Sequence, residues 1–472
     1  MRRYSARMPN ARTLGELKAS EYRSRSVREE MRRNLLDRLR TSERLLPGIV
    51  GFDDTVLPEI ENAVLSGHHM VFLGERGQAK SRIIRSLVEL LDEQIPVVEG
   101  CALNDDPLAP ICRECHRRLH ELGDALPVAW IGRDRRYGEK LATPDVSIAD
   151  LIGEIDPVKV AEGRYLADEE TIHYGIIPRC NRGLFAINEL PDLTEKVQVG
   201  LFNLMEEKDV QIKGYKIRLP VDVVFVASAN PEDYTSRGRI ITPLKDRFDA
   251  QIRTHYPRDI EHEIAIMEQE LPALDRGDLP VHVPDFIKEI IAQFTFEARA
   301  SNEVNQASGV SVRMTINNYE SVISNAEKRA TRLGEAEIVP RVSDLHAINA
   351  SSVGKLELEY AGEDSRDSDL VERLLQRAVL AAFDARWQPE QLEAVCAYFQ
   401  AGGGVEVSDA TPASEYLEAV RGIEGLADAV RACTSAESPP FIAAATELVL
   451  AGLHLHQKLN CETIGGRRTY RG

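Results

Sequence analysis

The residues Val71–Ser81, with the sequence VFLGERGQAKS, constrain the fold more than any other part of the chain. The apolar run from Met70 to Leu73 predicts a buried strand, and Arg82–Leu91 has the apolar spacing of a helix. A glycine-containing loop that ends in Lys-Ser connects the two. This order of elements is typical of a phosphate-binding loop, and it predicts an α/β fold with a parallel sheet.

Each part of this loop has a physical role in holding phosphates. Glycines allow the backbone to turn sharply, and backbone N–H groups at a helix N-terminus attract anions. Lys80 would reach the β- and γ-phosphates, and the Ser81 hydroxyl would bind Mg²⁺. Ala79 stands where the common pattern has glycine, and we expect a right-handed or extended backbone there. The alternative is an ordinary strand–turn–helix connection. The predicted ATP contacts are Gly74, Glu75, Arg76, Gly77, Gln78, Ala79, Lys80 and Ser81.

Polar residues follow two later apolar strands. Gly183–Ile187 ends at Asn188-Glu189, and Val221–Ala229 ends at Asn230. The carboxyl ends of parallel strands are where ligands bind in such sheets. Glu189 would orient and deprotonate the attacking water. Asn188 stands where such sites usually have Asp, and its carbonyl would accept a hydrogen bond from a Mg²⁺-bound water. The Asn230 amide would orient water. The alternative for each is a cap or turn.

Two arginines complete the predicted catalytic set. Arg247, in the segment LKDRFD, would act as an arginine finger on the ATP of a neighbouring subunit. Its alternative is an ion pair with Asp246 or Asp249. Arg313 begins a helix after Gly309, and it would couple a helical lid to the nucleotide.

The chain order predicts four regions. A basic N-terminal arm (1–45), predicted as one helix over 15–45, precedes an α/β nucleotide-binding domain (46–256) with an insertion at 100–180. An α-helical lid (257–360) and a further C-terminal helical region (361–472) follow. Within the α/β domain we expect a second strand at Gln94–Glu99, irregular structure at 100–150 and a hairpin at Val210–Leu219. We expect a loop at Ala401–Pro412.

The net charge, the apolar runs and the cysteine count exclude several classes of protein. The net charge of −18 argues against a general nucleic-acid binder, although residues 1–45 hold 13 Lys and Arg against 6 Asp and Glu. The sequence lacks an apolar run of membrane-spanning length, so we expect no transmembrane helix. The N-terminus lacks the apolar core of a secretory signal, and seven cysteines do not suggest a disulfide scaffold. We therefore expect a cytoplasmic protein.

A group of cysteines lies in the predicted insertion. Cys101, Cys112 and Cys115 are followed by His116, a set with the ligand types of a tetrahedral Zn²⁺ site, and Cys180 is a further candidate. Free thiols in a reducing cell and a redox pair at Cys112 and Cys115 are the alternatives.

The order and spacing of these motifs over Leu46–Leu356 resemble the AAA+ ATPases of the MoxR and magnesium chelatase subunit I group. The loop with Ala before Lys, the segment RCNRGLFAINEL and the later SANPED and LKDRF carry the resemblance. It implies that Glu189 is the catalytic base, Asn230 sensor 1, Arg247 the finger and Arg313 sensor 2. Asn188 departs from the group's Asp.

The resemblance also implies how such a protein works. It implies an ATP- and Mg²⁺-dependent motor that forms a ring, usually a hexamer, and acts on a partner protein with a von Willebrand A domain. One alternative is an authentic magnesium chelatase subunit that drives Mg²⁺ insertion into protoporphyrin. Another is a nucleotide-gated scaffold with little turnover, which Asn188 favours. The last ~115 residues lie outside the resemblance.

Overall fold

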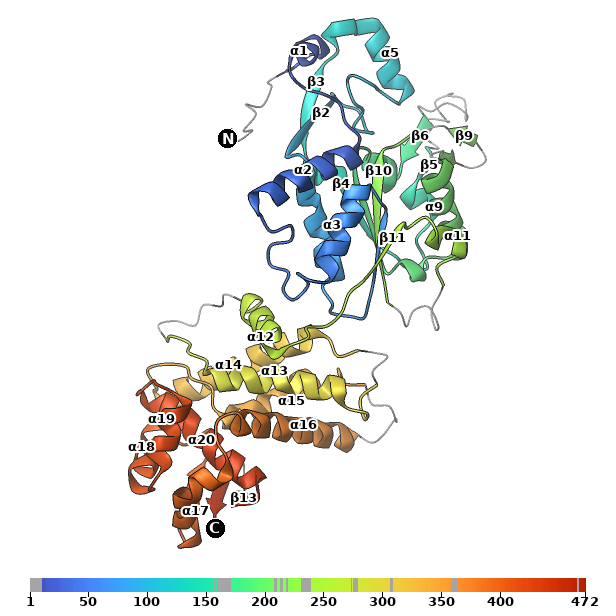
Figure 1. The fold of residues 1–472 in the computed structure, drawn as a ribbon. Coiled ribbons are helices and arrows are strands. Elements are labelled where there is room, and N and C mark those ends of the chain that lie inside the picture. Colours follow the sequence, from blue (N-terminus) through green and yellow to red (C-terminus); the bar gives the residue numbers. More distant parts are fainter. Residues whose placement is uncertain are drawn as a thin grey trace. The chain divides into compact units, whose positions relative to one another are not determined.

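The structure is a computed structural model of the chain, and it forms two compact units, Met1–His255 and Tyr256–Gly472. Figure 1 labels the helices and strands of both units. The described residues are 11–156, 158, 161, 171–207, 210–212, 215–217, 220–230, 239–272, 274, 279–305, 309–357, 364–464 and 467–472.

A five-stranded parallel sheet forms the centre of the first unit, which confirms the α/β prediction. Its strand order is β11-β1-β10-β7-β4, and all four pairings are parallel. The carboxyl ends of these strands therefore lie at one edge of the sheet. The strands are β1 Met70–Leu73, β4 Tyr137–Leu141, β7 Gly183–Asn188, β10 Val223–Ala229 and β11 Ala250–Arg253.

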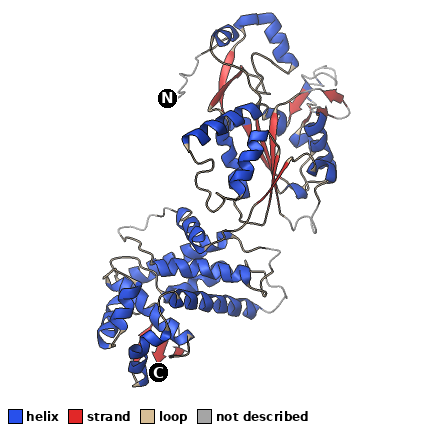
Figure 2. Cartoon of the chain, in the orientation of Figure 1, coloured by secondary structure: helices blue, strands red, loops and turns tan. Residues whose placement is uncertain are grey.

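Helices lie on both faces of this sheet (Figure 2). The three central strands are mostly apolar, apart from Ser228 and Asn188 near their carboxyl ends, because successive side chains alternate between two buried cores. Leu184 and Ala186 of β7 face one core, and Phe185 and Ile187 face the other. Burying one such large side chain stabilises the fold by about 1.5–3 kcal/mol. The two cores include residues of α2 Val27–Thr41, α3 Val56–Ser66 and α4 Lys80–Ser86 on one face, and of α9 Glu195–Glu207 and α11 Thr242–Lys245, among other helices, on the other.

The N-terminal segment differs from the expected single helix. It forms two helices, α1 Leu14–Ala19 and α2, because Ser26 starts a new helix with a capping box that includes Glu29. The apolar face of α2 is buried in the first unit. Glu30 of α2 is also buried, where it accepts hydrogen bonds at 2.9 and 2.6 Å from the guanidinium of Arg136.

The segment between residues 94 and 150 is more regular than expected. The predicted second strand is present as β2 Gln94–Val98, but it pairs antiparallel with β3 Val128–Gly132 outside the five-stranded sheet. The edge of the main sheet is instead β4, whose sequence YGEKL is polar because an edge strand is covered less than a central one. Because β4 is polar, the search for apolar runs in the sequence did not predict it.

Smaller elements complete the first unit. The predicted hairpin at Val210–Leu219 is confirmed by the antiparallel strands β8 and β9, and its expected tip at 213–214 lies outside the described residues. These elements are η1 Leu87–Leu90, α5 Arg113–Leu122, η2 Gly123–Ala125, η3 Arg133–Arg136, α6 Ile148–Leu151, β5 Gly153–Ile155, β6 Ile172–Tyr174, α8 Ile176–Arg179, η5 Leu190–Asp192, β8 Val210–Ile212 and β9 Tyr215–Ile217.

The second unit is mainly helical, with a main hydrophobic core that extends from α12 to the C-terminal strands and a smaller cluster around Ala326, Ala330 and Ile338. The expected loop at Ala401–Pro412 contains a strand, β12, which joins two further strands in an antiparallel sheet. The elements are α12 Ile260–Gln269, α13 Asp285–Ala300, α14 Val312–Leu333, η6 Val342–Ala347, α15 Ile348–Ser352, α16 Asp364–Asp384, η7 Pro389–Leu392, α17 Glu393–Gln400, β12 Gly404–Val407, α18 Ala413–Gly422, α19 Leu426–Cys433, α20 Pro439–Leu455, β13 Asn460–Ile464 and β14 Arg467–Arg471.

Among the helices that the structure describes, none combines the length and apolarity needed to cross a lipid bilayer.

Candidate nucleotide site

The loop 74–81 lies between the end of β1 and the start of α4, at the carboxyl edge of the sheet. The Gly74 N–H donates to the Ala229 carbonyl at 3.2 Å, which ties the loop to β10. A Cβ on Gly74 would lie 2.1 Å from Thr254 Oγ1 and 2.2 Å from Gln78 Oε1, so only glycine fits there. Gln78 Oε1 accepts hydrogen bonds from the Glu75 N–H at 3.1 Å and from Thr254 Oγ1 at 2.8 Å. The loop is thus held in shape by its own chain.

Ala79 does not have the right-handed or extended backbone that we expected. Its φ is 57° and its ψ is 10°, a left-handed conformation. The reason is that the loop must reverse direction immediately before α4, and Gly77 (φ 79°) also has a positive φ. A left-handed conformation costs a non-glycine residue roughly 1–2 kcal/mol. The alanine in this loop is therefore strained.

Lys80 is buried at the start of α4, and its ammonium group contacts three oxygens. Nζ donates to the carbonyls of Gly74 and Glu75 and, at 2.5 Å, to Oδ1 of Asn230. The loop lysine and the polar residue at the end of β10 are therefore in direct contact. A buried ammonium at this position can exchange these neutral oxygens for phosphate oxygens.

Asn188, at the end of β7, connects the loop to the edge strand. Its Oδ1 accepts hydrogen bonds from Ser81 Oγ at 3.3 Å and Ser228 Oγ at 3.2 Å. Its Nδ2 donates to Oε1 of Glu139 at 2.6 Å. Ser81 and Asn188, both predicted to lie at the Mg²⁺ position, are thus brought together.

Glu139 supplies an acidic group that the sequence did not indicate. It lies on β4, and Arg85 donates two hydrogen bonds of 2.9 Å to its carboxylate. These bonds hold the pKa of the Glu139 carboxyl below its usual range. The signal for Glu139 was weak because its strand is short and polar. The other residues missed from the sequence are Ser228 and Thr254, which lie next to predicted strand ends.

Glu189, the predicted catalytic base, directly follows β7 and has a left-handed backbone with φ 57°. Its N–H donates to Ser228 Oγ at 3.2 Å, and its carboxylate oxygen Oε2 is shielded from solvent. Strained backbones of this kind are often found at functional positions. Glu189, Asn188 and Asn230 therefore all stand at the carboxyl edge of the sheet, beside the loop.

Arg247 lies beyond α11. Its Nε forms an ion pair with Oε2 of Glu206 at 2.6 Å, and its guanidinium lies over the Phe202 ring at 5.6 Å. The expected alternative partners were Asp246 or Asp249, but the observed partner is on α9. The described contacts of Arg247 are thus with α9 and not with the phosphate loop.

Arg313 belongs to the second unit, where it is exposed at the start of α14. Its N–H donates to the hydroxyl of the capping residue Ser311 at 3.2 Å.

The structure brings together three of the five predicted zinc ligands and leaves His116 and Cys180 outside the group. Cys101, Cys112 and Cys115 come together, and Asp105 joins them. His116 is exposed on α5, and Cys180 packs elsewhere, with its thiol donating to the Ile176 carbonyl at 3.1 Å.

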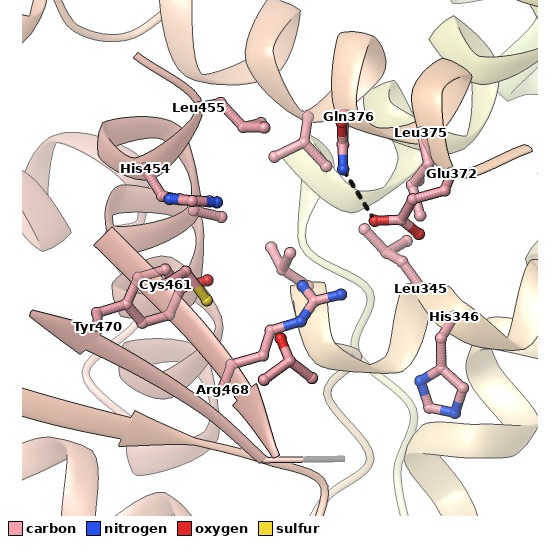
Figure 3. Close-up of a pocket in the computed structure, with 14 residues that line it drawn as sticks. Leu345, His346, Glu372, Leu375, Gln376, His454, Leu455, Cys461, Arg468 and Tyr470 are labelled. Atoms are coloured by element: carbon pink, nitrogen blue, oxygen red, sulfur yellow. Dashed lines mark hydrogen bonds between the residues drawn. The ribbon is translucent and has the colours of Figure 1, made fainter. Parts of the chain in front are cut away.

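The second unit contains a cavity of about 150 Å³ (Figure 3). Figure 3 shows Arg468 and Tyr470 of the C-terminal strand on one side, and Leu345, Glu372 and Gln376 on the other. Among the described residues that line it, none was predicted from the sequence as a site residue.

Parts of the chain are similar in sequence to known proteins. The chain is 28% identical over 225 residues to the magnesium-chelatase 38 kDa subunit of Rhodobacter capsulatus, covering 47% of this chain and 59% of that protein. It is 27% identical over 248 residues to the magnesium-chelatase subunit ChlI of a Nostoc species, covering 51% and 60%. The chain thus spans less than two thirds of the length of these relatives. No protein-family model matches the chain.

A solved complex of the magnesium chelatase subunits BchI and BchD is similar at 20% identity and a TM-score of 0.35, covering 68% of this chain and 97% of that one. A TM-score this low adds nothing to the assignment, which depends on the sequence similarity. That similarity supports the resemblance of the chain to the chelatase-like group of AAA+ ATPases.

Proposed function

We propose that this chain binds and hydrolyses ATP as an AAA+ motor that works in a ring and remodels a partner protein. The observation that supports this most is the contact between Lys80 and Asn230, together with that between Ser81 and Asn188. These two contacts bring a buried cation, a hydroxyl and two strand-end amides to one edge of the sheet. That is the set of groups that phosphoryl transfer requires.

The loop fits ATP and Mg²⁺. Gly74 leaves room for the close packing of the loop, and Lys80 offers a buried ammonium for phosphate oxygens. Ser81 Oγ and Asn188 Oδ1 are oxygen donors of the kind that Mg²⁺ and its waters prefer. A bound Mg²⁺ would neutralise charge that develops on the phosphates. Loop residues 74–81 would bind the nucleotide through their backbone N–H groups.

The residues of the chain then have distinct tasks. Glu189 accepts a proton from the attacking water, and Asn230 exchanges its bond with Lys80 for one that orients this water or the γ-phosphate. Arg247 leaves Glu206 and stabilises transition-state charge on the ATP of a neighbouring subunit. Arg313 contacts a phosphate from the lid and couples the lid to the nucleotide. A ring follows from this proposal because the described contacts of Arg247 do not include the phosphate loop of its own chain. We expect a hexamer, a partner with a von Willebrand A domain and the cytoplasm as the location.

A mixing experiment tests catalysis and ring formation together. Glu189→Gln and Arg247→Ala should each lower steady-state ATP hydrolysis at least tenfold, the scale of general-base and arginine-finger effects. Glu195→Gln and Arg40→Ala, which change exposed groups on α9 and α2, should leave it unchanged. Mixing the two inactive variants should restore part of the activity, because some sites then combine an intact Glu189 with a neighbour's intact Arg247. Absence of recovery, with ring formation confirmed by light scattering, would refute action in trans.

Two alternatives remain as proposals. The relatives named as magnesium-chelatase subunits favour a role in Mg²⁺ insertion into protoporphyrin, and reconstitution with a porphyrin-binding subunit would detect it. A nucleotide-gated scaffold is favoured by the neutral Asn188. Wild-type turnover equal to that of both inactive variants, with ATP still bound, would support the scaffold and reject the motor. A zinc ion in the insertion is a separate proposal.

A further inference from the structure

Four potential metal ligands converge in the insertion of the first unit. The thiols of Cys101, Cys112 and Cys115 and a carboxylate oxygen of Asp105 all lie within 4.8 Å of one another. Asp105, Cys112 and Cys115 are buried, and Cys101 is half-buried. They come from the turn after β2 and from the N-terminus of α5, so they are close in space because of the fold.

A cation would stabilise the buried carboxylate of Asp105. It is fully buried, and its Oδ2 accepts two hydrogen bonds of 3.0 Å, from the N–H groups of Ile111 and Cys112. Its Oδ1 is also buried, but it accepts no hydrogen bond from the described part of the chain. A buried carboxylate oxygen without a partner is costly, and a bound cation removes that cost.

The sulfur atoms are also arranged for negative charge. The Leu103 N–H donates to Cys101 Sγ at 3.3 Å, and the Cys115 N–H donates to Cys112 Sγ at 3.3 Å. Cys112 is the N-cap of α5, where the helix favours a thiolate. Such N–H donors around metal-bound sulfur orient the ligand and stabilise its charge. All three cysteines are free thiols.

We propose that Cys101, Asp105, Cys112 and Cys115 bind one structural Zn²⁺ ion. Ligands at zinc distances in a tetrahedron lie roughly 3.5–3.8 Å apart, so the group needs only a small contraction to fit. Three thiolates select a soft or borderline metal, and four protein ligands leave no open position, as in structural zinc sites. A redox pair at Cys112 and Cys115 would explain neither the third thiol nor the partnerless oxygen of Asp105.

The ion would fix an insertion that also contacts α1. It would join the turn after β2 to α5, and the chain then leads to Leu126, whose carbonyl accepts a hydrogen bond of 2.9 Å from the Leu14 N–H. Lys18 of α1 forms an ion pair with Asp124 at 2.7 Å in the same region. Loss of zinc should therefore loosen residues 99–126 and α1, and leave the parallel sheet intact.

Elemental analysis of the full chain, purified with a reducing agent and without added metal, tests the site directly. We expect one zinc per chain for the wild type and a large loss for Asp105→Asn and Cys112→Ser. The matched controls are His116→Ala, which removes an exposed neighbour, and Cys180→Ser, which removes a buried thiol outside the group. Both should keep one zinc per chain.

Two further measurements keep the proposal testable if a variant fails to fold. Wild-type chain depleted of zinc by a chelator should take up Co²⁺ with the visible absorption of tetrahedral thiolate coordination. The zinc-depleted chain, before any metal is added back, should also exchange backbone amide hydrogens faster in residues 99–126 than in β7 and β10. Wild-type protein that contains no zinc and takes up neither Zn²⁺ nor Co²⁺ would overturn the proposal, as would controls that lose zinc as fully as Cys112→Ser.

Discussion

Replacing Asn188 by Asp gives the chain the acid that such nucleotide sites usually have, but the structure predicts that it destabilises the protein without Mg²⁺. Asn188 Nδ2 donates to Glu139 Oε1 at 2.6 Å, and an aspartate cannot donate this bond. Two unit charges 4 Å apart repel by about 1 kcal/mol in water and about 4 kcal/mol near a protein surface. A lost hydrogen bond to a charged group costs about 1.5–3 kcal/mol. Because Arg85 still faces Glu139 and the Glu139 side chain is 20% exposed, we expect a loss of about 2–4 kcal/mol in the free energy of unfolding.

The assay is chemical denaturation with and without Mg²⁺ and a nucleotide. A divalent cation beside Ser81 turns the new carboxylate from a repulsive group into a ligand, so Mg²⁺ with nucleotide should stabilise Asn188→Asp more than it stabilises the wild type. The double variant Asn188→Asp, Glu139→Gln removes the repulsion and restores a donor next to position 188. It should recover most of the lost stability in the absence of Mg²⁺.

Two results would refute this reasoning. One is an Asn188→Asp variant that is as stable as the wild type in a chelator. The other is a double variant no more stable than the single one, because the loss would then come from somewhere other than Glu139.

Three further predictions concern the first unit. Ala79→Gly should raise the free energy of unfolding by up to about 1 kcal/mol, because glycine relieves the left-handed strain but is more flexible when unfolded; a decrease in chemical denaturation would contradict this. Arg136→Met should cost about 3–5 kcal/mol, because it leaves the Glu30 carboxylate buried without its cation, and Arg136→Met combined with Glu30→Leu should cost less. The folded-state pKa of Glu139 lies below its unfolded value of about 4.3. The ionised Glu139 therefore stabilises the fold above that pH, and this stabilisation disappears as the pH falls through the lowered pKa. The stability of Glu139→Gln, measured by denaturation across these pH values, should fall less with acid than that of the wild type, and an equal fall would reject the role of Arg85.

Local patterns determined much of the candidate site. The loop 74–81, Asn188, Glu189 and Asn230 could be predicted because each follows a short apolar strand, and parallel strands bring their carboxyl ends to one edge. The same reasoning missed Glu139, because its strand is short and polar and lies at the edge of the sheet. The reasoning also left open which strand β2 pairs with, because an apolar run indicates a strand but not its partner.

The predicted zinc ligands show the same difference between what local spacing indicates and what the tertiary structure decides. Spacing alone indicated Cys101, Cys112 and Cys115, but it favoured His116 as the fourth ligand because His116 is adjacent in the chain. The structure instead exposes His116 and buries Asp105 beside the thiols. Helix periodicity decides this, since the residue next to Cys115 points away from the face that Cys115 occupies.

The sequence by itself determined the α/β class, the strand–loop–helix arrangement around residues 74–81 and the strand-end residues, because these depend on contacts between near neighbours and on the alternation of apolar side chains. Only the tertiary structure decided the left-handed Ala79, the contact of Asn188 with Glu139, the pairing of Arg247 with Glu206 and the place of Asp105 among the thiols. The last three join residues that different elements carry, and the first follows from the path of the loop. The physical reason is that a side chain's partner depends on how strands and helices pack, and many packings are compatible with the same local pattern.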